Sequence, residues 1–295
     1  MTTTLEPVRH ADFSHTALVY AGEDDLIERL RPLVADALAG GDPVLLCYPE
    51  RVTGAVRDTV GATPRLLTME TGARYARPGV AMSELQRFAR QPLTAGSRTW
   101  SIGGVPLTGT SADRAWRRYE SSIETVLGDV PLRAVCTFDA ATIAPEALDV
   151  MLALHEPHHD SGHPLPPDSP TPDRHPDLLL QPSTAAEARA ATTRWLDGRV
   201  DAERLDEVRL VTSELVTNSL VHGAHPVTLR GWTDPQRTVL QLSDCGPGID
   251  RFADLRPSGG GPDGGFGLWL VGQLAAEVDI RRAAGENVVT AVLAH

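Results

Sequence analysis

The sequence predicts a two-domain α/β protein, with a three-layer α/β/α domain followed by a two-layer α/β sandwich. Three observations lead to this prediction. Apolar strand-like runs alternate with amphipathic helical patterns over residues 15–156, which is typical of a mainly parallel sheet covered by helices on both faces. Prolines then crowd residues 157–182, which is the composition of a linker. Beyond them the order is helix, helix, hairpin, loop, helix, hairpin, which favours an antiparallel or mixed sheet with helices on one face.

Composition excludes several classes of protein. With 41% hydrophobic and 22% charged residues, the 295-residue chain is typical of globular domains. The net charge of −12 argues against sequence-independent nucleic-acid binding, which needs clustered Lys and Arg. No apolar run approaches the roughly 20 residues that cross a bilayer, and the polar N-terminus does not resemble a signal peptide. We therefore expect a cytoplasmic protein that binds neither nucleic acid nor membrane.

The three cysteines, Cys47, Cys136 and Cys245, lie far apart in the sequence. Without a C-x-x-C pair, neither a zinc site nor a disulfide framework is expected. Cys47 and Cys136 both end apolar runs, which favours buried free thiols.

The first domain is predicted to contain five strands and five helices. The strands are expected at residues 15–20, 44–48, 65–69, 98–102 and 132–139, and the helices at residues 24–39, 52–60, 81–89, 112–127 and 145–154. The turn after the first strand, Ala21–Asp25, has no phosphate-loop pattern, and its acidic residues would repel phosphate. We therefore expect no nucleotide hydrolysis in this domain.

Three short segments of this domain, His15–Tyr20, Cys136–Asp139 and Leu154–His155, resemble the MEDS sensory domain of bacterial and archaeal regulators. The resemblance covers residues 13–156. It implies a RecA-like sheet adapted for sensing or docking, and it does not name the ligand.

Histidines gather at the end of this domain and in the proline-rich stretch, at His155, His158, His159 and His163. They suggest either a metal or haem site or solvated linker histidines, and the second is favoured because metal sites need rigid geometry. His15 and His155 can instead meet inside the folded domain, in a core or pocket role.

The second domain begins near Asp177, after a linker at residues 157–176. An edge strand is expected at residues 178–181, and Ser183 is the predicted N-cap of a helix ending near Leu196. Asp201 or Asp206 begins the long helix that follows. The remaining strands are expected at residues 227–232, 238–243, 278–282 and 288–293, with a hairpin at Asp234–Pro235 and a helix over residues 268–277.

The long helix carries Glu214, Asn218 and His222 at i, i+4 and i+8, so these side chains share one side. A carboxylate and an amide oxygen one turn apart suit Mg²⁺, which prefers oxygen ligands and bridges to phosphates. A solvated polar face is the alternative for this helix taken alone.

Asp244 ends a predicted strand and enters a turn with Gly246 and Gly248, where backbone can approach a flat ligand. Its carboxylate can accept a hydrogen bond from the amine of adenine. An Asp-led β-turn is the alternative. The glycine-dense residues 258–267 end at a helix N-terminus, which attracts phosphate, unless they form only a surface loop.

Together these pieces resemble the GHKL (Bergerat) ATP-binding fold over residues 178–293, and we assign residues 177–295 to this domain. The resemblance implies binding of ATP and Mg²⁺, with Asn218 as the Mg²⁺ ligand and Glu214 as the catalytic residue. It implies that the nucleotide contacts come from Asn218, His222, Asp244, Gly246, Gly248, Ile249, Gly265, Phe266, Gly267 and Leu268.

Within that superfamily, Thr212–Gly223 is most similar to bacterial anti-sigma serine kinases of the partner-switching type. The resemblance implies a sigma factor and a Ser/Thr-phosphorylated antagonist as partners, and a homodimer. A nucleotide-binding module without kinase activity, and a small ATPase or atypical histidine kinase, remain alternatives. Two departures bear on catalysis: residues 285–289 lack the family's Thr, and Phe266 stands where the lid is often polar or basic.

Overall fold

The computed structural model describes residues 10–91, 93, 96–108, 113–156, 169–257 and 266–295. The chain divides into two compact units. The first carries the elements from β1 to α6, and the second carries those from β6 to β10. Among the described residues, no helix is both long enough and apolar enough to cross a membrane.

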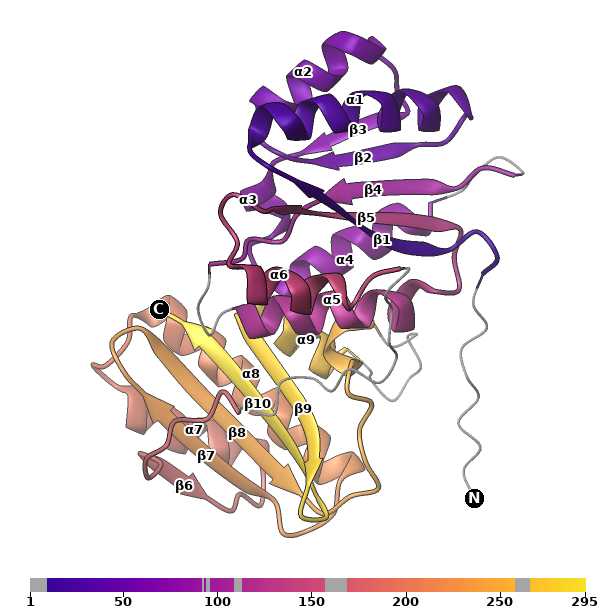
Figure 1. The fold of residues 1–295 in the computed structure, drawn as a ribbon. Helices are drawn as coiled ribbons and strands as arrows, with labels where there is room; N and C mark the ends of the chain where they lie inside the picture. The colour runs from indigo at the N-terminus through magenta and orange to yellow at the C-terminus, as the bar shows by residue number, and fades with distance from the viewer. Residues whose placement is uncertain (1–9, 92, 94–95, 109–112, 157–168, 258–265) are drawn as a thin grey trace. The chain divides into compact units, whose positions relative to one another are not determined.

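The first unit is built on a five-stranded sheet whose neighbouring strands are all parallel, in the order β1-β5-β4-β2-β3. Helices α1 and α2 cover one face of this sheet and α4 and α5 cover the other (Figure 1). The three-layer prediction is therefore confirmed. The strands are β1 (Ser14–Tyr20), β2 (Val44–Cys47), β3 (Leu66–Met69), β4 (Thr99–Gly103) and β5 (Leu132–Asp139). The helices are α1 (Glu23–Ala39), α2 (Glu50–Val60), α3 (Thr71–Arg74), α4 (Pro78–Ala89), α5 (Asp113–Leu127) and α6 (Pro145–Leu152).

Burial follows the hydrophobic pattern of these elements. All four residues of β2 are buried, as expected for a central strand with helices on both faces. On α1 the buried side chains recur at Leu26, Leu30, Val34 and Ala37, so one stripe of the helix faces the sheet. These residues form one core with α2 and the adjoining strands.

Helix α3 lies in a stretch where the sequence pattern indicated no element. It is a single turn, and the buried guanidinium of Arg74 fixes its end. Arg74 donates from Nη1 to Cys47 Sγ at 2.9 Å and from Nη2 to Ser101 Oγ at 3.2 Å. Cys47 lies on β2 and Ser101 on β4, so the local sequence periodicity does not predict this turn.

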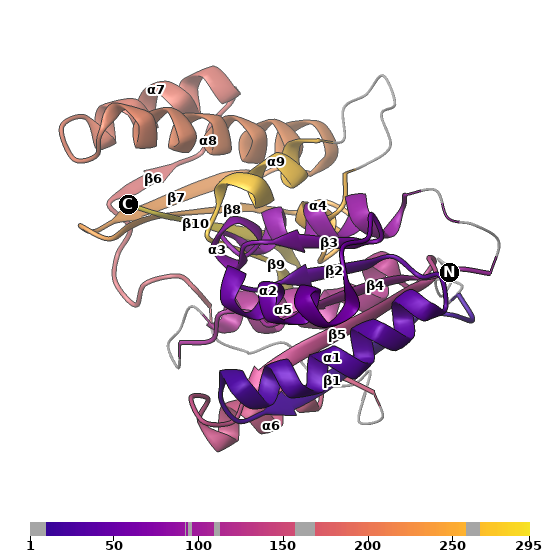
Figure 2. The same cartoon turned by 90° about the horizontal axis from the view of Figure 1, so that it is seen from above.

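The second unit is a two-layer sandwich, as predicted. Its five strands pair antiparallel in the order β6-β7-β8-β10-β9. Helices α7 and α8 lie on one face of the sheet (Figure 2), and the buried core lies between them and the strands. The elements are β6 (Leu178–Leu180), α7 (Ala185–Leu196), α8 (Ala202–His222), β7 (Thr228–Thr233), β8 (Arg237–Asp244), the short 3₁₀ helix η1 (Ala253–Leu255), α9 (Gly267–Leu274), β9 (Glu277–Ala283) and β10 (Glu286–Ala294).

The helix starts correct one prediction. Thr184, not Ser183, is the N-cap of α7: its side chain accepts the backbone N–H of Glu187 at 3.1 Å. The Glu187 carboxylate in turn accepts the N–H of Ser183, the residue before the cap, at 2.8 Å. Ser183 therefore precedes the cap. Of the two candidates for α8, Asp201 is the N-cap and accepts the N–H of Arg204 at 2.8 Å.

Part of the predicted linker is hydrogen-bonded to the second unit. Trp232 Nε1 on β7 donates to the carbonyl of Arg174 at 2.9 Å, and Gln241 Nε2 on β8 donates to Thr171 Oγ1 at 2.9 Å. The Asp177 carboxylate accepts the N–H of Thr233 at 2.9 Å. Hydrogen bonds from Arg174 lower the pKa of Asp177, which is therefore ionised near neutral pH.

Candidate functional site

Helix α8 presents Glu214 and Asn218 on the side away from the core. Their neighbours Leu215 and Val216 are buried against the sheet, whereas Glu214 and Asn218 are only partly covered. The i, i+4 spacing predicted from the sequence therefore places both polar groups on one accessible face.

The start of α9 lies directly against these two side chains. A Cβ atom on Gly267 would lie 2.7 Å from Glu214 Oε2 and 3.0 Å from Asn218 Nδ2. Only glycine fits there while both side chains keep their positions. The structure thus brings together the helix motif and the glycine motif, which lie about fifty residues apart in the chain.

The side-chain nitrogen of Asn218, Nδ2, is buried and has no hydrogen-bond partner among the described residues. A buried polar atom without a partner costs free energy, about 1–3 kcal/mol. Rotation of the side-chain amide by 180° exchanges its oxygen and nitrogen, so either end of the amide can face a ligand. A phosphate oxygen or a Mg²⁺ ion would satisfy the group, so this residue set fits Mg²⁺ and a nucleotide phosphate.

Asp244, at the end of β8, is buried, and its carboxylate accepts three hydrogen bonds. Oδ2 accepts Ser219 Oγ at 2.7 Å, and Oδ1 accepts both the N–H of Gly246 and Nδ2 of Asn287, each at 2.8 Å. Ser219 follows Asn218 on α8, so one helix turn carries both the unpartnered amide and a donor to Asp244. These bonds fix the carboxylate at one orientation, which suits recognition of a planar base.

Two glycines pack tightly around that carboxylate. A Cβ on Gly246 would lie 2.7 Å from the Cα of Gly223, and a Cβ on Gly223 would lie 2.6 Å from Asp244 Cγ. The end of α8 and the turn after β8 are therefore in backbone contact. This contact holds the end of α8 beside Asp244.

We expect Gly223→Ala to destabilise the second unit. The added methyl would lie 2.6 Å from both Asp244 Cγ and the carbonyl oxygen of Ser219, and neither atom is the end of a flexible side chain. Overpacking of this kind costs about 1–3 kcal/mol. Urea unfolding measures the change. Gly267→Ala is the comparison, because its methyl meets only the ends of the Glu214 and Asn218 side chains. If Gly223→Ala is as stable as the parent protein, the tight packing around Gly223 is contradicted.

The other residues predicted to contact the nucleotide differ in burial and conformation. Ile249 and Leu268 are partly buried and pack against the hydrophobic core of the second unit. Gly248 has a φ of 115°, a conformation that favours glycine. Phe266 is exposed and its ring lies edge-on to that of Trp269. His222 is exposed in the last turn of α8, and Gly265 lies outside the described residues.

Two residues of this site escaped the sequence analysis as functional candidates, Ser219 and Asn287. Asn287 lies directly opposite Asp244 in the β8–β10 register, so the pairing of these two strands decides that contact. Residues 285–289 lack the Thr of the family pattern, and in this segment Asn287 donates a hydrogen bond to Asp244. Arg282 adds a further bond, from Nη1 to the carbonyl of Gly246 at 3.2 Å.

Comparison with protein families matches two models to this chain. Residues 178–293 match the histidine kinase-like ATPase domain, and residues 14–156 match the MEDS domain, described as the methanogen/methylotroph, DcmR sensory domain. The chain joins a MEDS domain to a histidine kinase-like ATPase domain. The resemblances to the MEDS domain and to the GHKL ATP-binding fold are confirmed, and an ATPase domain of this family implies nucleotide binding.

Among solved structures, one similar chain contains the RsbU and RsbW domains of Rv1364c from Mycobacterium tuberculosis. It shares 21% sequence identity at a TM-score of 0.30, over 40% of this chain and 32% of that chain. This chain therefore spans about a third of that structure. No curated protein matches the sequence.

The MEDS domain has a pocket of about 390 Å³ near the carboxyl ends of β1, β2 and β5. Its polar lining includes Tyr20, Tyr48, Thr137 and Asp139. Burial raises the pKa of both phenols, and Tyr48 hydrogen-bonds Thr137 at 2.8 Å, so the phenols are neutral hydroxyls at physiological pH. Ligands of open parallel sheets bind in this position.

In the turn after β1 of the MEDS domain, two backbone N–H groups donate hydrogen bonds to carboxylates of the domain. Asp25 accepts the N–H of Ala21 at 2.8 Å, and Asp139 accepts the N–H of Gly22 at 3.1 Å. The amides that would cradle a phosphate in a nucleotide-binding loop are thus engaged.

His15 and His155 meet in the core of the MEDS domain, with ring centroids 4.1 Å apart. Of the two roles considered for His155, the structure places it inside the folded unit. His158, His159 and His163 lie outside the described residues. Cys47 and Cys136 are buried free thiols, as predicted.

Proposed function

We propose that the second unit binds ATP with Mg²⁺ and transfers the γ-phosphoryl group to a Ser or Thr hydroxyl of a protein antagonist, under control of the MEDS domain. The observation that carries this proposal is the meeting of Glu214, Asn218 and Gly267. It places a carboxylate, an unpartnered amide and the N-terminus of a helix at one point. These are the groups that phosphoryl transfer uses for positioning and charge stabilisation.

Each residue has a distinct proposed task. Asp244, held by Ser219, Gly246 and Asn287, accepts the adenine amine. Asn218 holds Mg²⁺, which supplies charge neutralisation at the phosphates when bound. Glu214 accepts the proton of the protein hydroxyl, whose oxygen forms a bond to the γ-phosphorus while the bond to ADP breaks. His222, Gly248, Ile249, Gly265, Phe266 and Leu268 complete the proposed nucleotide contacts.

The partners follow from the similarity of Thr212–Gly223 to anti-sigma serine kinases. We propose that the ATPase domain holds a sigma factor and releases it when an unphosphorylated antagonist competes. A homodimer is part of this proposal. The order of domains supports control by the MEDS domain, since a sensory domain precedes the ATPase domain in the same chain.

Two measurements test the proposal. The purified full-length protein should contain or bind ATP or ADP, measured by calorimetry and by analysis of released nucleotide. With γ-labelled ATP and Mg²⁺, label should appear on a candidate antagonist that carries a Ser or Thr acceptor. Release of free phosphate without a protein acceptor would indicate an ATPase. Tight nucleotide binding with neither reaction would indicate a binding module and would overturn the kinase assignment.

A further inference from the structure

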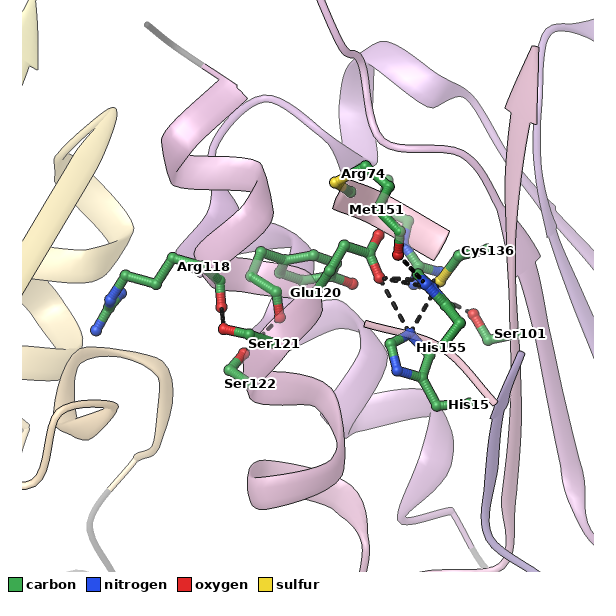
Figure 3. A network of polar contacts seen from close by, with 11 residues as sticks. His15, Arg74, Ser101, Arg118, Glu120, Ser121, Ser122, Cys136, Met151 and His155 are labelled. Carbon is green, nitrogen blue, oxygen red and sulfur yellow. Dashed lines mark hydrogen bonds and ion pairs between the residues drawn. The ribbon is translucent and has the colours of Figure 1, made fainter. Parts of the chain in front are cut away.

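Four side chains that are common metal ligands meet in the core of the MEDS domain: His15, Glu120, Cys136 and His155 (Figure 3). All four are buried, and one ligand atom from each lies within 4.8 Å of every other. This cluster is separate from the proposed nucleotide site, and the proposed function does not use it.

The fold brings these residues together from four segments. His15 lies on β1 and Cys136 on the neighbouring β5, where the register pairs Cys136 with Ala17, two residues after His15. Side chains two apart share a face of the strand, so both project to the same side. Glu120 reaches them from α5, and His155 follows α6. The N–H of Glu156 donates to the carbonyl of His15 at 2.9 Å, which ties the last segment to β1.

Four of the separations between the ligand atoms lie between 3.1 and 3.4 Å, close to those of a tetrahedral metal site. Bonds of about 2.0–2.3 Å to a four-coordinate zinc ion put neighbouring ligand atoms roughly 3.3–3.7 Å apart. Here Glu120 Oε2 lies 3.1 Å from His15 Nε2, 3.1 Å from Cys136 Sγ and 3.4 Å from His155 Nε2. His15 Nε2 lies 3.3 Å from Cys136 Sγ. Charge-assisted N–H···O⁻ bonds are shorter, about 2.7–2.9 Å.

The tautomer of His155 also favours a bound cation. Its Nδ1 lies 2.7 Å from the carbonyl oxygen of Met151, an acceptor, so Nδ1 carries a proton. In the neutral ring, Nε2 then carries a lone pair, and this lone pair faces the Glu120 carboxylate. Two acceptors therefore face each other. Consistent with this, Nε2 has no hydrogen-bond partner among the described residues despite its burial. A cation between Nε2 and Oε2 would satisfy both atoms.

The surroundings are those of a histidine ligand. Metal-binding histidines usually donate their other ring N–H to a carbonyl or carboxylate, as His155 does to Met151. Glu120 Oε1 is also buried without a partner among the described residues. A divalent cation with one thiolate and one carboxylate has no net charge, so burying the occupied site is not opposed by an uncompensated charge.

We propose that His15, Glu120, Cys136 and His155 bind a divalent transition-metal ion, and that Zn²⁺ is the ion they fit best. Imidazole nitrogen, thiolate and carboxylate oxygen are all ligands of tetrahedral zinc, whereas a shell with nitrogen and sulfur ligands is unsuited to Mg²⁺ or Ca²⁺. Binding releases the Cys136 thiol proton to solvent, because the thiolate is the ligand. Cysteine spacing did not predict this site, because a single cysteine takes part.

The test uses the full-length protein, freed of any histidine tag. Mass spectrometry of the metal content should find about one zinc per chain, as expected for a closed structural site. After chelation, stoichiometric Co²⁺ should produce visible d–d bands and a near-ultraviolet thiolate charge-transfer band. Cys136→Ser should abolish the near-ultraviolet band. Cys47→Ser, which alters the other buried cysteine of the domain, should keep it.

Two results would overturn the proposal. One is a folded protein that neither retains zinc nor gives the Co²⁺ bands, which would leave the four side chains as a hydrogen-bonded cluster without a metal. The other is an unchanged charge-transfer band in Cys136→Ser. If circular dichroism shows that this variant does not fold, X-ray absorption of the zinc-loaded parent protein decides. One sulfur and three nitrogen or oxygen neighbours are expected, and a shell without sulfur rejects the site.

Discussion

Replacing Glu214 by glutamine is expected to slow phosphoryl transfer to the protein acceptor by about 10²–10⁴-fold, the usual contribution of a general base. The substitution preserves the size of the side chain, so its contact with Gly267 is kept. It removes the charge and the basic oxygen that would accept the hydroxyl proton. ATP affinity should change little, because Glu214 is proposed to contact the hydroxyl and not the nucleotide. Single-turnover transfer from labelled ATP measures the rate, and calorimetry measures the affinity.

Glu203→Gln is the matched control for this experiment. It makes the same chemical change in the first turn of the same helix, at an exposed residue. Its transfer rate should equal that of the parent protein. If Glu214→Gln transfers phosphate at the parental rate, Glu214 is not the base, and the proposed mechanism loses its proton acceptor.

Replacing Asp244 by asparagine is expected to weaken ATP and ADP binding by about 10- to 100-fold, since a hydrogen bond to a charged group contributes about 1.5–3 kcal/mol. The fold should survive the change. The asparagine oxygen can keep the bonds from Gly246 and Asn287, while its NH₂ faces Ser219, whose hydroxyl can accept as well as donate. What is lost is the charged acceptor for the adenine amine.

Calorimetric titration with ADP measures this loss, and urea unfolding verifies that the variant is stable. Asp206→Asn, at an exposed position on α8, is the control and should bind like the parent. An unchanged affinity in Asp244→Asn would reject the adenine assignment. If Asp244→Asn weakens the binding of GTP and of ATP to a similar extent, Asp244 does not act through recognition of the adenine base.

Much of the fold was predictable because it rests on local periodicity. The predicted strand at residues 132–139 coincides with β5, and the helices α1, α2 and α5 begin within two residues of their expected positions. The backbone geometry of helices and strands fixes these periods, so apolar spacing indicates the element directly. The exceptions depend on tertiary contacts: α3 ends at the buried Arg74, which is held by Cys47 and Ser101.

The candidate nucleotide site divides in the same way. The spacing of Glu214 and Asn218 on one helix placed them on one face, as the structure has them. The packing of α9 decided that Gly267 lies against both, and strand register decided that Asn287 donates to Asp244. Such contacts join residues tens of positions apart, and no local pattern encodes them.

The cluster in the MEDS domain shows this limit most clearly. The sequence determined that His15 and Cys136 lie on strands and that His155 follows a helix. Only the tertiary structure decided that β1 pairs with β5 and that α5 places Glu120 between the two histidines. Strand order and helix packing depend on how the whole core is buried, so the convergence of four side chains from four segments emerges only in the folded unit.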